Sequence, residues 1–373
     1  MLVLLLAVMI VGAACTADDD TAADDTDAAL PADTDTETDE DAEGDTPAAE
    51  GEILSAVQDR GTLNCGVNDA VPGFGFTDEE GEFSGFDIDH CRAIAAAVLG
   101  DAEAVEFRPL TAEQRFTALQ AGEVDVLVRN TTWTATRDGA EGATFLHTTF
   151  YDGQGMMVRA DSEFQTLEDM GDTAICVLSG TTTELNLSSE FTRLDLNYEP
   201  VPFEDNETLQ QAFEAERCDG WTSDKSQLAG VRSTFPEGPD ALVILDETIS
   251  KEPLGPAVLQ GDPEWAQAVD WAVIATIQAE EFGITSENTA DFEGSDNPDI
   301  ASFLGEEDPE EGTVLDPGLP GLEPGFARDV VEQVGNYGEI YDRNLGPDTD
   351  IGLERGLNAL WTDGGLLYAP PYR

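Results

Sequence analysis

One arginine of this chain stands among small polar side chains. Arg137 follows the run Asn130-Thr-Thr-Trp-Thr-Ala-Thr, which comes directly after an expected strand. A guanidinium can hold a carboxylate through two parallel charge-assisted hydrogen bonds, each contributing about 1.5–3 kcal/mol away from water. Since the chain has only 16 Lys and Arg residues, this arginine is a candidate carboxylate-binding residue. The alternative is a surface arginine paired with Asp138 or Glu141.

A second polar segment, Ser179-Gly-Thr-Thr-Thr-Glu184, follows another expected strand. Thr181 and Glu184 have the spacing of a capping box, which predicts that a helix begins there. The free N–H groups and the positive dipole end of a helix N-terminus attract a carboxylate. Asp224, at the end of a neighbouring strand, is placed to take an ammonium group. Together these groups predict a site that binds both charged ends of an α-amino acid.

Aromatic residues near the first strand are candidates for the apolar walls of this site. They are Phe74, Phe76 and Phe86. Phenylalanine is also among the residues most often found in the core. The sequence leaves the choice between a wall and the core open.

Motifs for nucleophilic or phosphate chemistry are missing from the sequence. No GxSxG or GxxxxGK[ST] motif occurs, and Gly153-Gln-Gly155 lacks the third glycine of a dinucleotide-binding turn. The only histidines are His90, expected on the surface of a helix, and His147, expected in a loop or at a strand edge, so a Ser/His or Cys/His pair is not expected. No CxxC occurs, which disfavours zinc. We therefore expect a binding protein that uses no cofactor or metal, and not an enzyme.

The elements that must position these residues alternate between strands and helices, which predicts an α/β fold with helix-covered sheets. In the first region we expect a strand over residues 62–67, a helix from an N-cap at Asp87 to Gly100, a helix from a Thr111–Gln114 capping box to Gly122, and a strand over residues 124–128. In the second region we expect a strand over residues 174–177, a helix capped by Asn206, and a strand over residues 218–222.

The two regions repeat one pattern at an offset of 94 residues. Ala118-Leu-Gln-Ala-Gly-Glu-Val-Asp125 aligns with Ala212-Phe-Glu-Ala-Glu-Arg-Cys-Asp219. The same offset places Asn130 opposite Asp224, and both lie just past the C-terminal end of a strand. Ligands of open α/β sheets bind beyond those strand ends. The repeat therefore predicts a cleft between two similar lobes, with chance similarity as the alternative.

The expected organisation divides the chain into five parts. We predict a signal peptide over residues 1–15, a tether over 16–52, lobe 1 over 53–154 and 250–290, lobe 2 over 155–249, and a C-terminal extension over 291–373 packed on lobe 1. Residues 327–345 of the extension are expected to form a helix that presents Tyr337, Ile340 and Tyr341 on one face. A short helix is expected over residues 358–361.

The charge is strongly negative, with 79 Asp and Glu against 16 Lys and Arg and a net charge of -63. Residues 16–52 hold 16 of the acids, which leaves 63 acids against 16 bases, about -47, elsewhere. Such a field repels nucleic acid and anionic lipid. An acidic body also suggests a salty environment, because salt screens its self-repulsion.

The first residues suggest export. Residues 2–11 form an apolar run that is too short to span a bilayer, which needs about 20 residues, and small residues and Cys15 follow it. This ending resembles a bacterial lipobox, although Gly12 is an imperfect match, and it predicts lipidation at Cys15. An ordinary secretion signal is the alternative. The Asp/Thr/Ala-rich segment that follows suits a solvated tether between a membrane and a folded body.

Five cysteines are present, and lipidation of Cys15 leaves four. These four, Cys65, Cys91, Cys176 and Cys218, allow three pairings in an oxidising compartment. We favour Cys65–Cys91 with Cys176–Cys218, because each pair falls within one expected lobe.

Longer stretches resemble a known family, the general L-amino acid-binding proteins of bacterial ABC importers within the polar amino acid-binding group. The matching stretches lie at residues 60–67, 85–97, 116–134, 151–155, 180–187, 249–257, 334–340 and 356–361, and they cover the chain from about residue 53 to its end. The resemblance implies a two-lobe periplasmic-binding-protein fold of the second type that closes on an L-amino acid and docks on a permease. It also implies broad specificity and a monomer.

The resemblance also implies roles for single residues. Arg137 matches the carboxylate-binding arginine of the family, and Thr132 and the carbonyl of Asn130 match neighbouring contacts. Thr181 and Thr182 match the second-lobe carboxylate contacts, although the family often has glycine where this chain has Thr182. Asp224 matches the ammonium-binding aspartate. The leading rival is an enzyme on the same fold, similar to a prephenate or arogenate dehydratase, and a sensory ectodomain is a third possibility.

Overall fold

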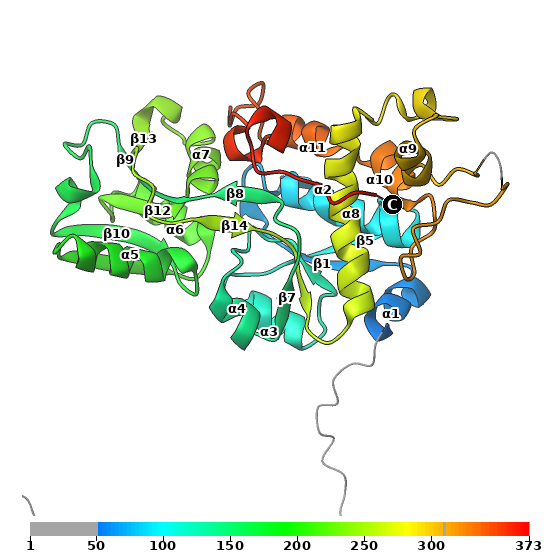
Figure 1. Cartoon of the computed structure of the whole chain (residues 1–373). Coiled ribbons are helices and arrows are strands. Elements are labelled where there is room, and N and C mark those ends of the chain that lie inside the picture. Colours follow the sequence, from blue (N-terminus) through cyan, green and yellow to red (C-terminus); the bar gives the residue numbers. More distant parts are fainter. Residues whose placement is uncertain (1–50, 309–310, 373) are drawn as a thin grey trace, which may run out of the picture. The chain divides into compact units, whose positions relative to one another are not determined.

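The computed structural model describes residues 51–308 and 311–372, in which two five-stranded sheets stand apart (Figure 1). The first sheet has the order β5-β1-β6-β15-β7. Its strands are β1 (Leu63–Val67), β5 (Val105–Pro109), β6 (Val126–Leu127), β7 (Ala143–Phe145) and β15 (Ala257–Leu259). β1 is parallel to β5 and β6, whereas β15 is antiparallel to β6 and β7. The first sheet with its helices is called lobe 1 below.

The second sheet repeats this arrangement with the order β11-β10-β12-β9-β13. Its strands are β9 (Gln154–Arg159), β10 (Thr173–Leu178), β11 (Tyr198–Phe203), β12 (Gly220–Asp224) and β13 (Leu242–Ile244). β10 is parallel to β11 and β12, and β9 is antiparallel to β12 and β13. The mixed α/β class expected from the sequence is therefore confirmed. This sheet with its helices is called lobe 2.

Helices cover both sheets. Those of lobe 1 are α1 (Glu52–Arg60), α2 (Phe86–Leu99), α3 (Gln114–Gln120), α4 (Ala135–Ala140) and α8 (Pro263–Phe282), and those of lobe 2 are α5 (Thr182–Arg193), α6 (Asn206–Glu214) and α7 (Lys225–Ser233). α2 is buried from Phe86 to Val98 except at Arg92, because it is sandwiched between the sheet and further helices. Lobe 2 has one apolar cluster around Trp221 and another around Phe191.

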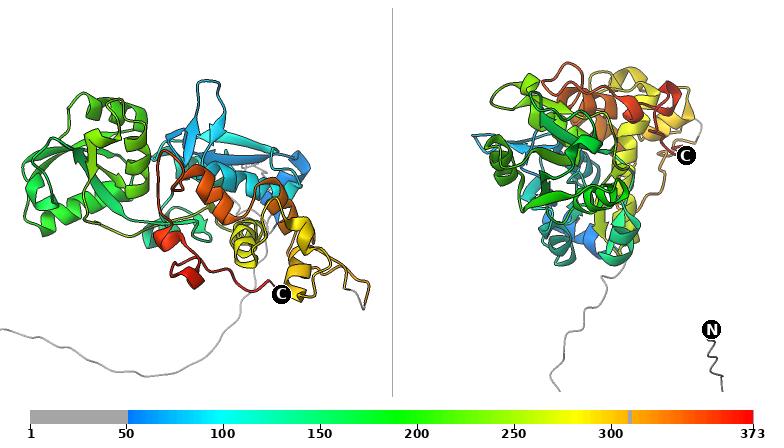
Figure 2. Two further views of the ribbon diagram at one scale, coloured as in Figure 1. Left: turned by 90° about the horizontal axis from the view of Figure 1, so that it is seen from above. Right: turned by 90° about the vertical axis from the view of Figure 1, so that its left-hand side faces the viewer.

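Two smaller β structures complete the fold. A ribbon of β8 (Phe150–Asp152) and β14 (Glu252–Leu254) runs between the two sheets, and Figure 1 and the left view of Figure 2 show it bridging the lobes. A three-stranded sheet of β2 (Ala70–Val71), β3 (Gly75–Thr77) and β4 (Phe83–Ser84) follows β1.

The repeat at an offset of 94 residues is present in the backbone. Asp125 donates its N–H to Asn64 O at 2.9 Å and accepts from Asn64 N at 2.7 Å through its carboxylate. Asp219 makes the same pair of bonds with Ala174, at 2.7 and 2.8 Å. In each lobe the aspartate thus ties the turn after a helix to the neighbouring strand.

Helix starts differ in part from the expectations. Thr111 and Gln114 do form the reciprocal bonds of a capping box, at 3.2 and 3.3 Å. The prediction of Asp87 as an N-cap is wrong, because α2 already begins at Phe86. Asn206 is also not a cap, since Asp205 precedes it and accepts from the N–H of Thr208 at 2.7 Å. An aspartate one position earlier captures the free N–H groups of that helix.

The C-terminal residues form two helices where one was expected. α10 (Phe326–Gln333) and α11 (Tyr337–Asn344) are separated at Gly335, whose φ of 100° is a left-handed conformation that favours glycine. Asn336 then caps α11 through a capping box with Glu339. Tyr337, Ile340 and Tyr341 are fully buried, as their shared face predicted. Both helices pack on α2 and α8.

The rest of this region is shorter and irregular. α9 (Pro298–Phe303) precedes a long loop, and the expected helix over residues 358–361 is instead two single 3-10 turns, Gly356–Asn358 and Trp361–Asp363. The turn Gly356–Asn358 lies close to β8, and in Figure 1 the last residues, in red, run from there across α8 to the C-terminus.

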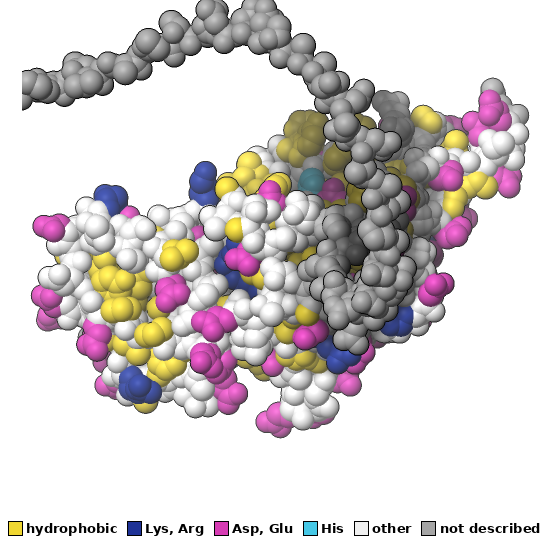
Figure 3. Space-filling model, turned by 90° about the horizontal axis from the view of Figure 1, so that it is seen from below, with side chains coloured by type: hydrophobic (Ala, Val, Ile, Leu, Met, Phe, Trp, Pro, Cys, Tyr) yellow, Lys and Arg dark blue, Asp and Glu magenta, His cyan; other side chains and the backbone are white. Residues whose placement is uncertain are grey.

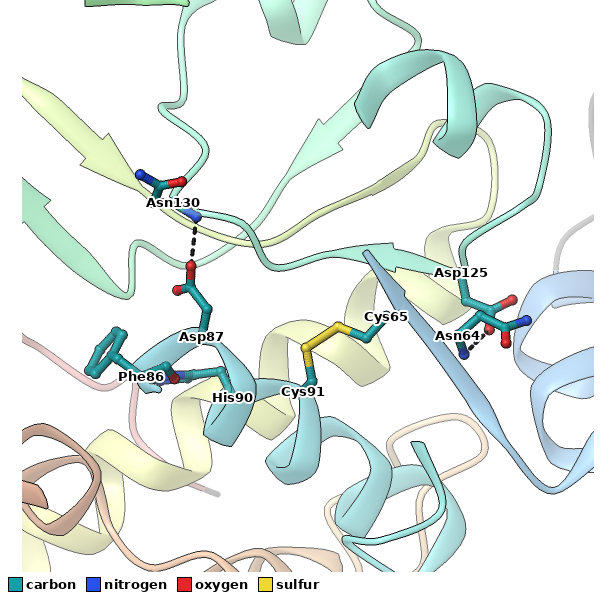
Figure 4. Close-up of a disulfide and its surroundings, with 8 residues drawn as sticks. All are labelled: Asn64, Cys65, Phe86, Asp87, His90, Cys91, Asp125 and Asn130. Atoms are coloured by element: carbon teal, nitrogen blue, oxygen red, sulfur yellow. Dashed lines mark hydrogen bonds between the residues drawn. A yellow bond between two sulfur atoms is a disulfide. The ribbon is translucent and has the colours of Figure 1, made fainter. Parts of the chain in front are cut away.

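Both predicted disulfides form. Cys65 in β1 bonds to Cys91 in α2 (Figure 4), and Cys176 in β10 bonds to Cys218 just before β12. Each bridge lies within one lobe. Cys15, the expected signal peptide and the expected tether lie outside the described residues. Within the described ranges, no helix is both long and apolar enough to cross a membrane.

Candidate functional site

A cavity lies between the lobes, where the polar candidates meet. Its lining includes Asn130, Thr132 and Arg137 from lobe 1, and Thr181, Thr182 and Asp224 from lobe 2. The other lining residues are Asn68, Arg115, Arg129, Leu178, Thr183, Asn206, Ser223 and Gln227. Leu178 is the one apolar side chain in this lining. The structure therefore brings together all six polar residues expected at the site.

Arg137 is held in place from two sides. Its N–H donates to the N-cap hydroxyl of Thr134 at 3.2 Å, and its guanidinium donates to the carbonyl of Thr132 at 2.9 Å. The guanidinium also lies 5.7 Å from the centre of the Phe116 ring. Only 8% of Arg137 is exposed, which contradicts a surface arginine. Burial lowers its pKa, while Glu252 and Asp224 favour its charged form.

Asp224, the last residue of β12, lines the same cavity as Arg137 and has one carboxylate oxygen without a hydrogen-bond partner among the described residues. It is 5% exposed, and its Oδ1 is a buried atom for which the described residues offer no hydrogen-bond partner. Burial, together with Asp152 and Glu252, raises its pKa well above the usual value, and Arg137 and Arg115 oppose that shift. A buried acceptor without a donor is costly. A cationic donor supplied by a ligand would remove that cost.

The first turn of α5 provides N–H groups at the cavity wall. Thr181 is the N-cap and accepts from the N–H of Glu184 at 3.1 Å. The Glu184 carboxylate accepts from Gly180 at 3.1 Å and not from Thr181, so the expected capping box forms only in part. The hydroxyl of Thr182 donates to Glu252 at 2.9 Å. The group that Thr182 can offer to a ligand is therefore its backbone N–H.

Neutral amides connect the lobes along one wall. Asn68 donates to the side chain of Asn130 at 2.6 Å, Asn130 donates to Gln227 at 3.3 Å, and Gln227 donates to Asn206 at 2.7 Å. On another wall the hydroxyls of Thr132 and Thr182 lie 3.4 Å apart. The two lobes thus already touch across the cavity.

The backbone at Asn130 has an unusual conformation that Asp87 stabilises. Asn130 has a φ of 34°, which few residues other than glycine adopt. Its N–H donates to the Asp87 carboxylate at 2.7 Å (Figure 4). Burial raises the pKa of Asp87 to about 7, although this bond and Arg129 act in the other direction. Asp87 therefore stabilises the backbone of the site, whereas the sequence predicted that it caps a helix.

Two arginines of the cavity were missed by the sequence reasoning. Arg115 is 3% exposed, donates to Gly180 O at 3.3 Å across the lobes, and leaves its Nε without a partner among the described residues. Arg129 is 5% exposed and donates to Leu110 O at 2.8 Å. Burial lowers the pKa of Arg129 to about 10. The available signal was that three of the chain's few cations fall within residues 115–137.

The aromatic candidates do not reach the cavity. Phe74 and Phe86 are fully buried and pack edge to face with each other and with Phe150. Neither belongs to the cavity lining, so the expectation that they form its apolar walls is wrong. Their rings fill the space between β3, α2 and α11, where burial of a large ring stabilises the core.

His90 is also in the core. It is fully buried, its Nδ1 lies 2.8 Å from Phe86 O, and burial lowers its pKa to about 4. The expectation of a surface histidine is wrong because α11 covers this face of α2. Within residues 51–308 and 311–372, no group of His, Cys, Asp and Glu side chains is arranged to hold a metal ion.

Comparison with known proteins gives a consistent result. Residues 63–287 match the family model for bacterial extracellular solute-binding proteins, family 3. The chain is 50% identical to the general L-amino acid-binding periplasmic protein AapJ of Rhizobium johnstonii over 327 residues, which are 87% of this chain and 94% of the relative. It is 46% identical to the glutamate/glutamine/aspartate/asparagine-binding protein BztA of Rhodobacter capsulatus over 87% of this chain and 95% of that protein.

A solved structure agrees with this match. The periplasmic binding protein of an ABC transporter from Brucella ovis, with glutathione bound, superposes with a TM-score of 0.82 at 45% identity. The match covers 87% of this chain and 100% of the Brucella chain. The likeness therefore includes the C-terminal residues that lie beyond the family model.

Proposed function

Since the chain belongs to the bacterial extracellular solute-binding proteins of family 3, we propose that it captures L-amino acids and delivers them to an ABC importer. One observation carries the proposal. A buried guanidinium from lobe 1, that of Arg137, and a buried carboxylate with a free oxygen from lobe 2, that of Asp224, line the same cavity. These two charges complement the two charges of a zwitterion.

The ligand is held mainly by its main-chain groups in this proposal. Its carboxylate lies between Arg137 and the first N–H groups of α5, and its ammonium group donates to Asp224. Thr182 contributes its N–H, since its hydroxyl is used by Glu252. The Thr132 hydroxyl and the Asn130 carbonyl are the neighbouring contacts from lobe 1.

Main-chain recognition also explains a broad range of ligands. The remaining lining, with Arg115, Arg129 and the amide side chains, faces the ligand's side chain and is polar. The names of relatives fit this range: AapJ is a general L-amino acid-binding protein, BztA binds two acidic amino acids and their amides, and the Brucella protein holds glutathione. The same clamp accepts each of these, because all carry an amino acid group.

Binding acts by closing the two lobes about the ribbon. A ligand can contact both lobes at once only in the closed state, so its binding shifts the equilibrium toward that state. We place lobe 1 at residues 53–154 and 250–290, lobe 2 at 155–249 and the C-terminal extension at 291–373. A monomer is sufficient for this mechanism, which light scattering with and without ligand would test.

Arg137→Ala tests the proposal most directly. Loss of two charge-assisted bonds weakens binding by about 100-fold or more, which titration calorimetry with a panel of L-amino acids measures. Arg108→Ala is the matched control, because Arg108 is an exposed arginine of the same lobe that forms an ion pair with the exposed Glu106. Equal affinities of the wild type and Arg137→Ala would refute the assignment.

The solute-binding relatives also favour a protein without catalytic activity. Incubation with prephenate or arogenate then yields no product, while amino acids still raise the unfolding temperature by binding the folded state. Product formation would favour the enzyme alternative.

Export and anchoring complete the proposal. We place the protein outside the cytoplasm, with residues 1–15 as a signal peptide, Cys15 as the lipidated residue and residues 16–52 as the tether. Lipid labelling lost in Cys15→Ser would support the anchor, and secretion without labelling would favour an ordinary signal.

The acidic surface suggests a salty medium. The face in Figure 3 shows many acidic and few basic side chains. Salt that screens this repulsion is expected to raise the unfolding temperature. A protein that gains nothing from added salt would contradict this.

A further inference from the structure

The ribbon between the lobes has an outer edge that no strand covers. β8 pairs with β14 alone, in a register that sets Tyr151 opposite Pro253. Proline has no N–H to donate across the ribbon. The N–H and C=O of Tyr151 point to the other side, where an unpaired backbone group would be costly when buried.

Asn358, from the part of the chain beyond the family model, takes both of these groups. Its Oδ1 accepts from Tyr151 N at 2.7 Å, and its Nδ2 donates to Tyr151 O at 3.2 Å. The carboxamide thus bonds as the peptide unit of a third strand would. Asn358 is 4% exposed, so water does not compete with these bonds.

Asn358 is itself held firmly. The side chain of Arg355 donates to Asn358 O at 2.8 Å and to Glu280 at 3.0 Å. The guanidinium lies 5.0 Å from the ring centres of Tyr337 and Tyr341. The matching stretch at residues 356–361, which the binding site does not use, is therefore fixed to α8 and α11 of the lobe 1 side.

The neighbouring residues of the ribbon bond to lobe 2 instead. The Asp152 carboxylate accepts from the N–H and the hydroxyl of Ser226 at the start of α7. Opposite it, Glu252 accepts from Thr182 and from Asn186 of α5, each at 2.9 Å.

One residue along, the attachments of β14 change to lobe 1. Pro253 O accepts from Trp133 N at 2.8 Å. In both strands the attachment thus changes from one lobe to the other between adjacent residues, Tyr151 and Asp152 in β8 and Pro253 and Glu252 in β14.

We propose that Asn358 is a positioning residue that serves as the third strand of the ribbon and fixes the pivot of lobe closure between Tyr151 and Asp152. This inference rests on the proposed function. Without Asn358, the segment of β8 that moves in the open state extends back toward Phe150. Closing the lobes then orders a longer segment and costs more conformational entropy. Ligand affinity then falls although no ligand contact changes.

Asn358→Leu tests the pivot, because leucine has a similar size and makes neither bond. We expect the Tyr151 amide to exchange its hydrogen at least tenfold faster, with and without glutamate or glutamine, and the affinity for these ligands to fall about threefold to tenfold. Leu357→Ala is the control, since Leu357 is adjacent and 55% exposed. It should leave both quantities within twofold of the wild type.

Unchanged exchange at Tyr151, or faster exchange with unchanged affinity, would overturn the proposal. Should Asn358→Leu fail to fold, Asn358→Asp keeps the acceptor for Tyr151 N and removes the donor to Tyr151 O, and a smaller loss of affinity in the same direction is then expected. Equal affinities of Asn358→Asp and the wild type would also overturn it. Failure of the wild type to bind any amino acid would instead refute the proposed function.

Discussion

Each lobe contains a helix followed by a strand that has the same backbone arrangement. These units are α3 with β6 in lobe 1 and α6 with β12 in lobe 2, and they differ at one position that lines the cavity. Both place an aspartate, Asp125 or Asp219, on the N–H of the adjacent strand. Five residues further on, the first unit has Asn130 and the second has Asp224. The backbone of the two units thus determines where a side chain enters the cleft. The residue type at that position then determines whether the side chain is neutral or charged.

The bonding of these two residues shows what the difference does. Asn130 is bonded through both side-chain atoms and its N–H, to Asn68, Gln227 and Asp87. Asp224 keeps Oδ1 free and has a raised pKa. The amide therefore joins the lobes, whereas the carboxylate retains a position for a ligand.

Asp224→Asn removes the difference between the two strand ends and should have the largest effect on affinity among the variants that test this comparison. Loss of one charge-assisted bond to the ligand's ammonium group costs about 1.5–3 kcal/mol, a loss of roughly 10-fold to 150-fold in affinity by calorimetry. Asp240→Asn, an exposed aspartate of the same lobe, is the control. An affinity within twofold of the wild type would remove Asp224 from the site.

The shared aspartates test the common part of the comparison. Asp125→Ala and Asp219→Ala each leave a strand N–H without its carboxylate acceptor, so each should lower the free energy of unfolding in urea titrations. The expected loss is about 1–3 kcal/mol at the part-buried Asn64 N–H and about 0.5–1.5 kcal/mol at the exposed Ala174 N–H. Ligand affinity should stay within twofold for both. A loss in only one variant would show that the two units are not equivalent.

The pH dependence of stability tests Asp87, the carboxyl that accepts from the N–H of Asn130. Because burial raises the pKa of Asp87 from 3.8 to about 7, the folded state holds a proton that the unfolded state has released, and stability falls as the pH rises through 7. Between pH 6.5 and 8 this amounts to about 0.8 kcal/mol. His90, with its pKa lowered from 6.5 to about 4, acts in the opposite direction, and between pH 6.5 and 8 it offsets about 0.4 kcal/mol of this loss.

Asp87→Asn keeps an acceptor for Asn130 and should remove the fall in stability between pH 6.5 and 8 in thermal or urea unfolding. The variant and the wild type are compared at pH 6.5 and pH 8. The same pH dependence in both proteins would mean that Asp87 is ionised throughout.

Thr182→Val should have only a small effect on binding. Its hydroxyl donates to Glu252 and not to the ligand position, so affinity should change by no more than about threefold. Thr181→Val, which removes the helix cap, should instead lower the free energy of unfolding by about 1 kcal/mol. A large loss of affinity in Thr182→Val would show that the hydroxyl binds the ligand.

Much of the fold was predictable because it depends on local patterns. The βα alternation, the repeat and the burial of Tyr337 and Tyr341 follow from spacing along the chain. The Cys65–Cys91 and Cys176–Cys218 pairs were favoured among three pairings because each falls within one expected lobe. The break of the last long helix at Gly335 was missed, because an interior glycine alone is a weak signal of a helix end.

The candidate site was predictable only in part. Arg137, Asp224 and the threonines were selected because polar side chains follow strand ends. Phe74, Phe86 and His90 were misplaced because α11, more than 240 residues away in sequence, covers α2. Arg115 was missed because its partner, Gly180 O, belongs to the other lobe.

The sequence by itself determined the α/β elements, the two-fold repeat, the family resemblance and the residue types that enter the cleft, since periodicity and motif spacing are properties of neighbouring residues. Only the tertiary structure decided that Asp224 Oδ1 has no hydrogen-bond partner among the described residues, that the Thr182 hydroxyl donates to Glu252, and that Asn358 completes a strand edge more than 200 residues before it. These are contacts between distant segments, and their partners are set by how the lobes, the ribbon and the last residues pack together.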